Sequence, residues 1–267
     1  MINGYYIIDS HCHIYPQKIA QLAVNHTDEF YNENSKRKGT VEDLITSSYK
    51  QGIDKFIVQS VATSKKQVKS INEFIAREVE NNKDKFVGLG TMHPESDDLE
   101  GDFMHLKELG LKGIKIHPDI QNFKLDCPGY MKIYELASKH GLVMLMHTGD
   151  SRYDNSNPNR LIPILKEFKN LKVVGAHFGC WSLWHTAPEM LCNFDNFFVD
   201  CSSSFAYLTL EESKKILLTY GEDKVLFATD YPMWNADTEI KRVLDMNLSD
   251  RALKKIFSEN AKKVFNI

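Results

Sequence analysis

Apolar and polar residues follow two different periods in this chain. Segments with one period alternate with segments of the other from the N-terminus to the C-terminus. Short runs rich in Val, Ile and Phe recur between longer segments whose apolar residues are spaced as on one face of a helix. Apolar strands separated by amphipathic helices are typical of a parallel sheet with helices on its outside. Eight such strands are predicted, at residues 5–9, 55–60, 86–90, 113–117, 142–147, 172–177, 197–201 and 225–229.

Helices are predicted between the strands, and a glycine often marks the point where a helix ends. The helical segments cover residues 40–51, 65–82, 97–109, 128–140, 158–168, 188–193, 210–220 and 237–245, with further helix over 249–264. Gly52, Gly110, Gly141 and Gly221 each follow one of them. Eight strand and helix units in 267 residues match the size of a (β/α)8 TIM barrel, which takes about 250 residues. We therefore predict an α/β fold of this type, as a single domain over residues 1–267.

The segments that follow the predicted strands are longer than those that precede them. The longest cover residues 14–39, 119–127 and 148–157. In a TIM barrel the loops after the strands form the active-site face, so the site is expected there. The first of these segments, which begins near Tyr15, is a candidate lid.

Composition narrows the classes of protein to consider. The 33 Lys and Arg residues against 36 Asp and Glu residues give a net charge of −3, which argues against a nucleic-acid partner. Five cysteines without a C-x-x-C pair suit free thiols in a reducing compartment. The N-terminus has no signal-peptide pattern, and no run approaches 18 apolar residues. We expect a cytoplasmic protein without a membrane partner.

Side chains that bind metals or protons stand at the ends of several predicted strands. His11 and His13 follow the first strand, and because side chains alternate between the two faces of a strand, both imidazoles point to the same side. His147, His177 and Asp230 stand at the ends of three later strands. A single histidine in such a place is usually a packing residue, but a barrel brings strand ends together. Three imidazoles and one carboxylate would form a mixed site of the kind that catalytic zinc uses.

The motifs around these residues resemble those of the amidohydrolase superfamily, in the branch that contains enzymes like aminocarboxymuconate-semialdehyde decarboxylase. The motifs are Asp9-Ser10-His11-Cys12-His13, Gly113-Ile114-Lys115-Ile116-His117-Pro118, His147-Thr148-Gly149, Ala176-His177-Phe178-Gly179 and Phe227-Ala228-Thr229-Asp230-Tyr231-Pro232. They span residues 9 to 232 in the order of the family. The resemblance implies a barrel of the metallo-dependent hydrolase type.

The resemblance also implies roles for these residues. His11, His13, His147 and Asp230 match the ligands of one divalent metal ion. His177 matches the histidine that deprotonates or orients the metal-bound water, and Asp230 would both bind the metal and move a proton. Zinc is the expected metal, and manganese, iron or cobalt fit almost as well.

Further side chains are candidates for substrate binding. Lys115 and His117 lie on the same face of the fourth strand. Lys115 could anchor a substrate carboxylate, form a structural salt bridge or, as in binuclear members of the superfamily, become carboxylated and bridge two metals; we expect one metal. The other candidates follow the fifth, sixth and eighth strands and are Arg152, Tyr153, Trp181 and Trp234.

Two reactions of a small molecule fit such a site. We expect a hydrolase, in which metal-activated water attacks the carbonyl of an amide, ester or lactone. The alternative is a non-oxidative decarboxylase of a small unsaturated or aromatic carboxylic acid, because its site is nearly identical. A TatD-like DNase shares the H-x-H start, but its Glu-bearing strand-four motif is missing here. A non-catalytic barrel would bind its metal without an open position for water. A homodimer is left open.

Overall fold

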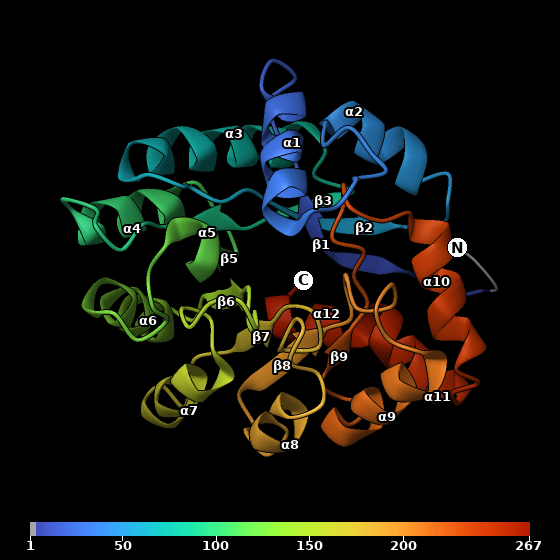
Figure 1. Ribbon diagram of the computed structural model, residues 1–267. Helices are drawn as coiled ribbons and strands as arrows, with labels where there is room; N and C mark the ends of the chain where they lie inside the picture. Colours follow the sequence, from blue (N-terminus) through green and yellow to red (C-terminus); the bar gives the residue numbers. More distant parts are fainter. Residues whose placement is uncertain (1–3) are drawn as a thin grey trace.

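The computed structural model describes residues 4–267 and places its strands in a ring (Figure 1). All strand pairs are parallel and join neighbours in sequence order. The strands are β1 Ile8–His13, β2 Lys55–Gln59, β3 Phe86–Gly88, β4 Gly90–Thr91, β5 Gly113–Ile116, β6 Val143–Met146, β7 Val173–Gly175, β8 Phe197–Asp200 and β9 Val225–Leu226. This arrangement confirms the predicted TIM barrel, with the third predicted strand divided into β3 and β4 at Leu89.

The helices lie outside the ring, as the periodicity predicted (Figure 1). They are α1 Ala20–Tyr31, α2 Val41–Asp43, α3 Val68–Asn81, α4 Leu99–Glu108, α5 Pro118–Gln121, α6 Pro128–His140, α7 Pro158–Glu167, α8 Ala187–Leu191, α9 Leu210–Tyr220, α10 Ala236–Asp245, α11 Asp250–Lys254 and α12 Asn260–Phe265. Short π-helical turns at Leu44–Ser48 and Lys255–Glu259 and a 3-10 turn at Lys65–Gln67 extend three of them.

The ends of individual helices follow from local chemistry. Helix α9 begins with a capping box, in which the Thr209 hydroxyl accepts the backbone N–H of Glu212 and the Glu212 carboxylate accepts that of Thr209. Helix α6 starts at a proline and ends at Gly141, whose φ of 68° is a conformation that glycine adopts without strain. Such signals made the boundaries of these two helices predictable from the sequence.

Hydrogen bonds close the ring between its first and last strands. The backbone N–H of Ser10 donates to Phe227 O over 3.0 Å, and that of His13 donates to Tyr231 O over 2.7 Å. Most strands contribute an apolar residue to the barrel interior. Helix α12 packs against this cluster with Ala261, Val264 and Phe265. No helix among residues 4–267 combines the length and the apolar character needed to cross a bilayer.

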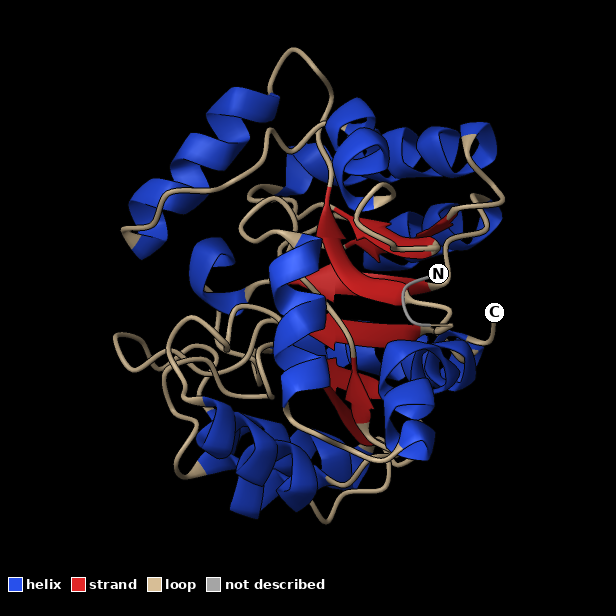
Figure 2. Ribbon diagram, turned by 90° about the vertical axis from the view of Figure 1, so that its right-hand side faces the viewer, coloured by secondary structure: helices blue, strands red, loops and turns tan. Residues whose placement is uncertain are grey.

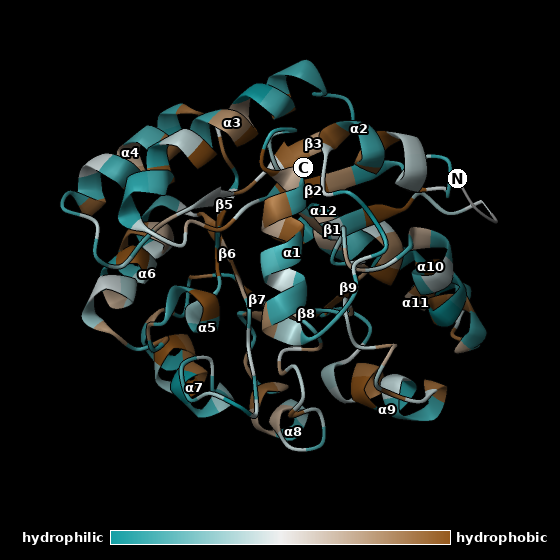
Figure 3. Cartoon of the chain, turned by 45° about the horizontal axis from the view of Figure 1, so that its top comes forward, coloured by the Kyte–Doolittle hydropathy of each residue, from teal (hydrophilic) through white to brown (hydrophobic). Residues whose placement is uncertain are grey.

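The two ends of the barrel differ. In Figure 2 the strands point toward the side that carries the long loops and α1, whereas the C-terminus lies on the opposite side. In Figure 3 the strands are mostly brown, while the helices around them alternate between brown and teal as amphipathic helices do. The long loops at the carboxyl ends therefore form the face on which the candidate site residues meet.

Two helices occupy segments for which only loop was predicted. Helix α1 lies within residues 14–39, the candidate lid, and α5 begins the segment predicted as a loop over 119–127. Helix α1 escaped prediction because its apolar side is narrow: Ala20 and Val24 are the buried residues among its twelve. The predicted helix over 40–51 is also interrupted, since α2 passes directly into a π-helical turn.

Candidate metal centre and substrate pocket

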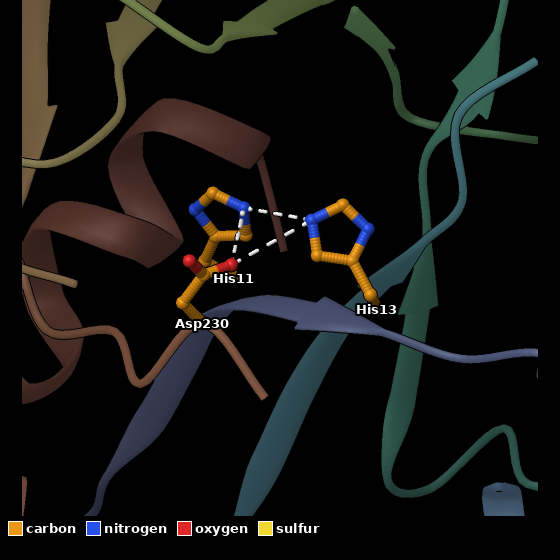
Figure 4. Close-up of side chains that lie close together, drawn as sticks. All are labelled: His11, His13 and Asp230. Atoms are coloured by element: carbon orange, nitrogen blue, oxygen red, sulfur yellow. Dashed lines mark hydrogen bonds and ion pairs between the residues drawn. The ribbon is translucent and has the colours of Figure 1, made fainter. Parts of the chain in front are cut away.

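Three of the predicted metal ligands meet at the end of β1. His11 and His13 point to the same side of this strand, with their Nε2 atoms 3.1 Å apart, and Asp230 Oδ1 lies 3.2 Å from His11 Nε2 and 3.6 Å from His13 Nε2 (Figure 4). Relative to β2, strand β1 carries one extra residue between Asp9 and Cys12, which is a bulge just before the histidine pair. The predicted common face of the two imidazoles is thereby confirmed.

The chemistry of these donors fits a cation. His11 Nδ1 faces the Asp200 carboxylate at 2.9 Å and therefore carries the proton of the neutral ring. Its Nε2 then carries a lone pair and no proton. It faces an oxygen of Asp230, so no hydrogen bond joins these two atoms. His13 Nδ1 is buried and has no hydrogen-bond partner among the described residues. Two imidazole nitrogens and one carboxylate oxygen that converge in this way are a donor set for a divalent metal.

Asp200 is the buried carboxylate that holds this arrangement in place. It ends β8, and its Oδ1 accepts the backbone N–H groups of His177 and Ser202. Burial would raise the pKa of Asp200, but its electrostatic interaction and hydrogen bond with the His11 imidazole outweigh burial and lower the pKa to about 2. The carboxylate is therefore ionised, and it fixes both the ring orientation and the tautomer of His11.

His177 lies beside the three donors and is held by its other nitrogen. Its Nδ1 is 3.1 Å from the carbonyl oxygen of Ser202, so the proton of the neutral ring is on Nδ1 and Nε2 is an acceptor. Burial lowers the pKa of His177 to about 4. His177 and Asp230 both have positive φ values, 60° and 56°, a conformation that costs non-glycine residues free energy and is concentrated at functional sites.

The fourth predicted ligand, His147, contacts His177 and Asp119. Its Nδ1 is 3.1 Å from His177 Nε2, and its Nε2 is 3.7 Å from Asp119 Oδ2. His117 stacks on it with ring centres 4.0 Å apart, and these two histidines form a second group of possible ligands with Asp119. Burial raises the pKa of Asp119 to about 6, and its Oδ1 has no partner among the described residues.

Lys115 reaches the centre from β5. Its Nζ lies 3.0 Å from His11 Nε2, and 1% of its surface is exposed. Burial lowers the pKa of Lys115, the Asp230 and Asp200 carboxylates act in the opposite direction, and the net value is about 8. The ammonium group thus contacts the same lone pair that would bind a metal.

A pocket opens above His177 and Asp230 and is walled by aromatic rings. The residues that line it are Tyr31, Glu33, His177, Trp181, Ser203, Tyr207, Asp230, Met233 and Trp234. Trp181 and Trp234, both predicted as pocket walls, are among them. Trp234 Nε1 donates to Ser203 Oγ, which in turn donates to Asp230 Oδ2. The candidate metal-binding carboxylate therefore forms part of the pocket lining.

Arg152 and Tyr153 lie beside this pocket and contact its cover. The Arg152 guanidinium donates to both carboxylate oxygens of buried Asp150 and to the carbonyl oxygen of Phe30. Tyr153 is 43% exposed and stacks on Phe30. Neither residue is among those that line the pocket. The guanidinium of Arg152, predicted as a substrate-binding candidate, thus makes its observed contacts within the protein.

Several residues of the site were not predicted. Asp200 stands at a strand end like the predicted ligands, so the same reasoning applied to the seventh predicted strand finds it. Asp119 lies in α5 and Asp150 in a loop, both in segments predicted as loop, and neither gave such a signal. Tyr31 belongs to the unpredicted helix α1, and its contact with His117 joins residues 86 positions apart.

Comparisons with known proteins place the chain in a family. The sequence profile of the amidohydrolase family matches residues 8–267. The chain belongs to the amidohydrolase family. This amidohydrolase-family protein is similar to a 2-amino-3-carboxymuconate-6-semialdehyde decarboxylase from Dictyostelium discoideum, with 27% identity over 205 aligned positions. The match covers 61% of this chain and 55% of the relative, so the chain spans about half the length of that protein.

Solved structures similar to this amidohydrolase-family chain share its barrel. A TIM-barrel protein from Bordetella bronchiseptica superposes with a TM-score of 0.82 at 16% identity, covering 98% of both chains. A dihydroxybenzoic acid decarboxylase from Polaromonas sp. JS666, with bound manganese and the inhibitor 2-nitroresorcinol, gives a TM-score of 0.74 at 17% identity, covering 98% of this chain and 97% of that one. The family match confirms the predicted family and that the chain is an enzyme, and these likenesses confirm the predicted fold.

Proposed function

We propose that this chain is a metal-dependent decarboxylase of a small aromatic or otherwise unsaturated carboxylic acid. The observation that carries the proposal is the pocket above His177 and Asp230, because Tyr31, Trp181, Tyr207 and Trp234 all contribute rings to its walls. Walls of this kind favour a flat, conjugated ligand. Conjugation is also what decarboxylation requires, since the electron pair left by the departing carboxylate must be delocalised.

The similar proteins with named activities support the same reaction. The Dictyostelium relative and the Polaromonas structure both carry the names of decarboxylases that act on conjugated acids. The alternative predicted from the motifs is therefore favoured over hydrolysis of an amide, ester or lactone. Hydrolysis stays as the competing function in the experiment below.

The proposed metal ligands are His11, His13 and Asp230, with His147 as the fourth. Zinc was the expected ion, and manganese, which the Polaromonas structure contains, is an equally suitable candidate. When bound, the cation would attract an anionic oxygen of the substrate and stabilise negative charge on the conjugated system.

His177 is the proposed proton carrier. Its Nδ1 keeps a proton on the Ser202 carbonyl, so Nε2 is the atom that exchanges a proton with the substrate. In the overall reaction a C–C bond breaks to release CO2, and one proton takes the place of the carboxylate on carbon. Asp230 assists by holding negative charge beside this proton.

Lys115, His117, Trp181 and Trp234 complete the proposed substrate site. Lys115 supplies positive charge below the pocket floor, where a substrate carboxylate would compensate it. The two tryptophans line the pocket and provide aromatic surface for the ligand. His117 acts through the side chain that its Nε2 contacts, Tyr31.

One assay separates the proposal from its alternative. The metal-loaded enzyme is incubated with a panel of aromatic and unsaturated carboxylates and, separately, with lactones, esters and amides. We expect CO2 release from at least one carboxylate without consumption of water. Hydrolysis of a neutral panel member without any CO2 release would contradict the proposal and favour the hydrolase.

A further inference from the structure

Tyr31 is the residue through which helix α1 reaches the site. It is the last residue of α1, and its ring lines the pocket together with His177 and Asp230. Its hydroxyl oxygen lies 2.6 Å from His117 Nε2 and 3.4 Å from both ring nitrogens of His147. The hydroxyl is thus the point where the cover of the barrel contacts the polar groups of the strand ends.

The hydrogen bonds around His117 determine which way the Tyr31 proton points. The backbone N–H of Ile120 donates to His117 Nδ1, so this nitrogen is an acceptor and the proton of the neutral ring is on Nε2. His117 Nε2 therefore donates to the Tyr31 oxygen. The phenol of Tyr31 also keeps its own proton near neutral pH, because the pKa of an ordinary tyrosine is about 10. That proton needs another acceptor, and His147 at 3.4 Å offers a long contact at best.

Most other donors of the pocket already have acceptors in the protein. The Tyr207 hydroxyl donates to Glu33, the Ser203 hydroxyl donates to Asp230, and the Trp234 indole donates to Ser203. A substrate that brings an anionic oxygen into this pocket therefore finds one hydroxyl whose proton is available. Because that hydroxyl itself accepts a hydrogen bond, it is polarised to donate more strongly.

Arg152 fixes the position of this hydroxyl. Its guanidinium is held by both oxygens of Asp150, donates to the carbonyl of Phe30, and lies over the rings of Phe30, Tyr31 and Trp181 at 4.9, 5.4 and 5.4 Å. Trp181 contacts the Tyr31 ring edge-on from another side. The end of α1 is therefore oriented by the Arg152 cation, which lies in the loop that follows β6.

We propose that the Tyr31 hydroxyl donates a hydrogen bond to a carboxylate oxygen of the substrate, and that Arg152 is the residue that positions it. This inference rests on the proposed function only in taking the ligand to be a carboxylate. It adds to the site a donor from the lid helix, so substrate recognition requires α1 in place over the barrel.

The test compares an acid with its decarboxylated counterpart as binding probes. Dissociation constants for 2,6-dihydroxybenzoate and for resorcinol are measured by calorimetry on the manganese-loaded wild type and on Tyr31→Phe. Loss of one hydrogen bond to a charged group should weaken binding of the acid about 10- to 100-fold and change that of resorcinol by less than about 2-fold. The matched control is Tyr49→Phe, because Tyr49 is half exposed and does not line the pocket.

Arg152→Ala should reproduce the loss for the acid, and the double variant with Tyr31→Phe should lose little more, because both changes remove one interaction. Equal binding of the acid by Tyr31→Phe and wild type would overturn the proposal. So would an equal loss for both probes, or a wild type that does not bind the acid. If the acid binds as expected but no carboxylate of the panel yields CO2, the decarboxylase proposal fails and the role of Tyr31 stands.

Discussion

His11 Nδ1 and Asp200 Oδ2 lie 2.9 Å apart, and both side chains are buried. This contact keeps the His11 proton on Nδ1 and leaves an unprotonated Nε2, which faces Lys115 Nζ, as the atom that would bind a metal. Asp200→Asn should weaken metal binding about 10- to 100-fold, because an amide N–H facing Nδ1 would favour the other tautomer and place a proton on Nε2. Competition with a chromophoric chelator measures the affinity.

Ser202→Ala is the matched control for Asp200→Asn. It removes a hydroxyl that contacts Asp200, His177 and, over 3.3 Å, His11 Nδ1, but it leaves the carboxylate that lies 2.9 Å from His11 Nδ1 intact. We expect its metal affinity to stay close to that of the wild type. An Asp200→Asn protein that binds metal as tightly as the wild type would show that the tautomer of His11 is not fixed by this carboxylate.

His177→Ala should abolish turnover and retain the metal. General acid and base catalysis contributes about 10²- to 10⁴-fold to rates, so CO2 release should fall by a factor of this size. Elemental analysis of the same preparation should give the metal content of the wild type, since the three converging donors are His11, His13 and Asp230. Loss of metal from His177→Ala would instead place His177 among the ligands.

His147→Ala tests the fourth ligand and the number of metals. If His147 completes the centre, the variant should bind metal more weakly than His117→Ala, which removes its stacked neighbour. We expect one metal per wild-type chain. Two metals per chain that fall to one in both variants would assign the second ion to the group of His117, Asp119 and His147.

Metal removal should also lower thermal stability. A ligand present at 100 times its dissociation constant stabilises the folded state by about 2.7 kcal/mol. For a chain of this size, the melting temperature should fall by roughly 2–4 °C for each kcal/mol lost on chelation. Calorimetry with and without added manganese measures the difference. An unchanged melting temperature in protein shown to lose bound metal would mean that the unfolded chain binds the metal about as tightly as the folded one.

Glu239 on α10 should make stability depend on pH. It is 3% exposed, its Oε2 has no partner among the described residues, and burial raises its pKa from 4.5 to about 8. Between these values the folded chain keeps a proton that the unfolded chain releases, so the contribution of Glu239 to the free energy of unfolding decreases as pH rises, by at most about 1.4 kcal/mol per pH unit.

Glu239→Gln removes this titration and should stabilise the protein at pH 8 relative to the wild type by roughly 1–3 kcal/mol, with a smaller gain at pH 5.5. Urea unfolding at both pH values gives the comparison. Glu211→Gln, on the exposed side of α9, should behave like the wild type. The same difference between Glu239→Gln and wild type at both pH values would refute a raised pKa.

The strands and most helices were predictable because their signals are local. An apolar run such as Val143–Met146 or a capped helix such as α9 carries its periodicity and its end signals in the sequence itself. The histidine pair on β1 was predictable for the same reason, since the spacing of two residues fixes a common face. These features depend on few long-range contacts.

The cover of the site was not predictable, since its contacts join distant segments. Arg152 was predicted as a substrate-binding candidate from its place after a strand, yet its partners include a carbonyl 122 residues away and a buried carboxylate two residues away. Likewise, nothing in the sequence around Tyr31 indicates a partner on β5 and its following loop. Sequence patterns locate strand ends, but they do not say which loop side chains meet above them.

The narrow buried face of α1 has a consequence for how the enzyme exchanges ligands. Of the twelve described residues of this helix, Ala20 and Val24 are buried, while the strands beneath it are buried almost throughout. A segment with so few apolar contacts detaches at a lower free-energy cost than the barrel. Amide hydrogens of α1 should therefore exchange with solvent long before those of β5 or β6. A bound acid should slow the exchange of α1 selectively. The residence time of a ligand would then be set by the opening of α1 rather than by the metal centre.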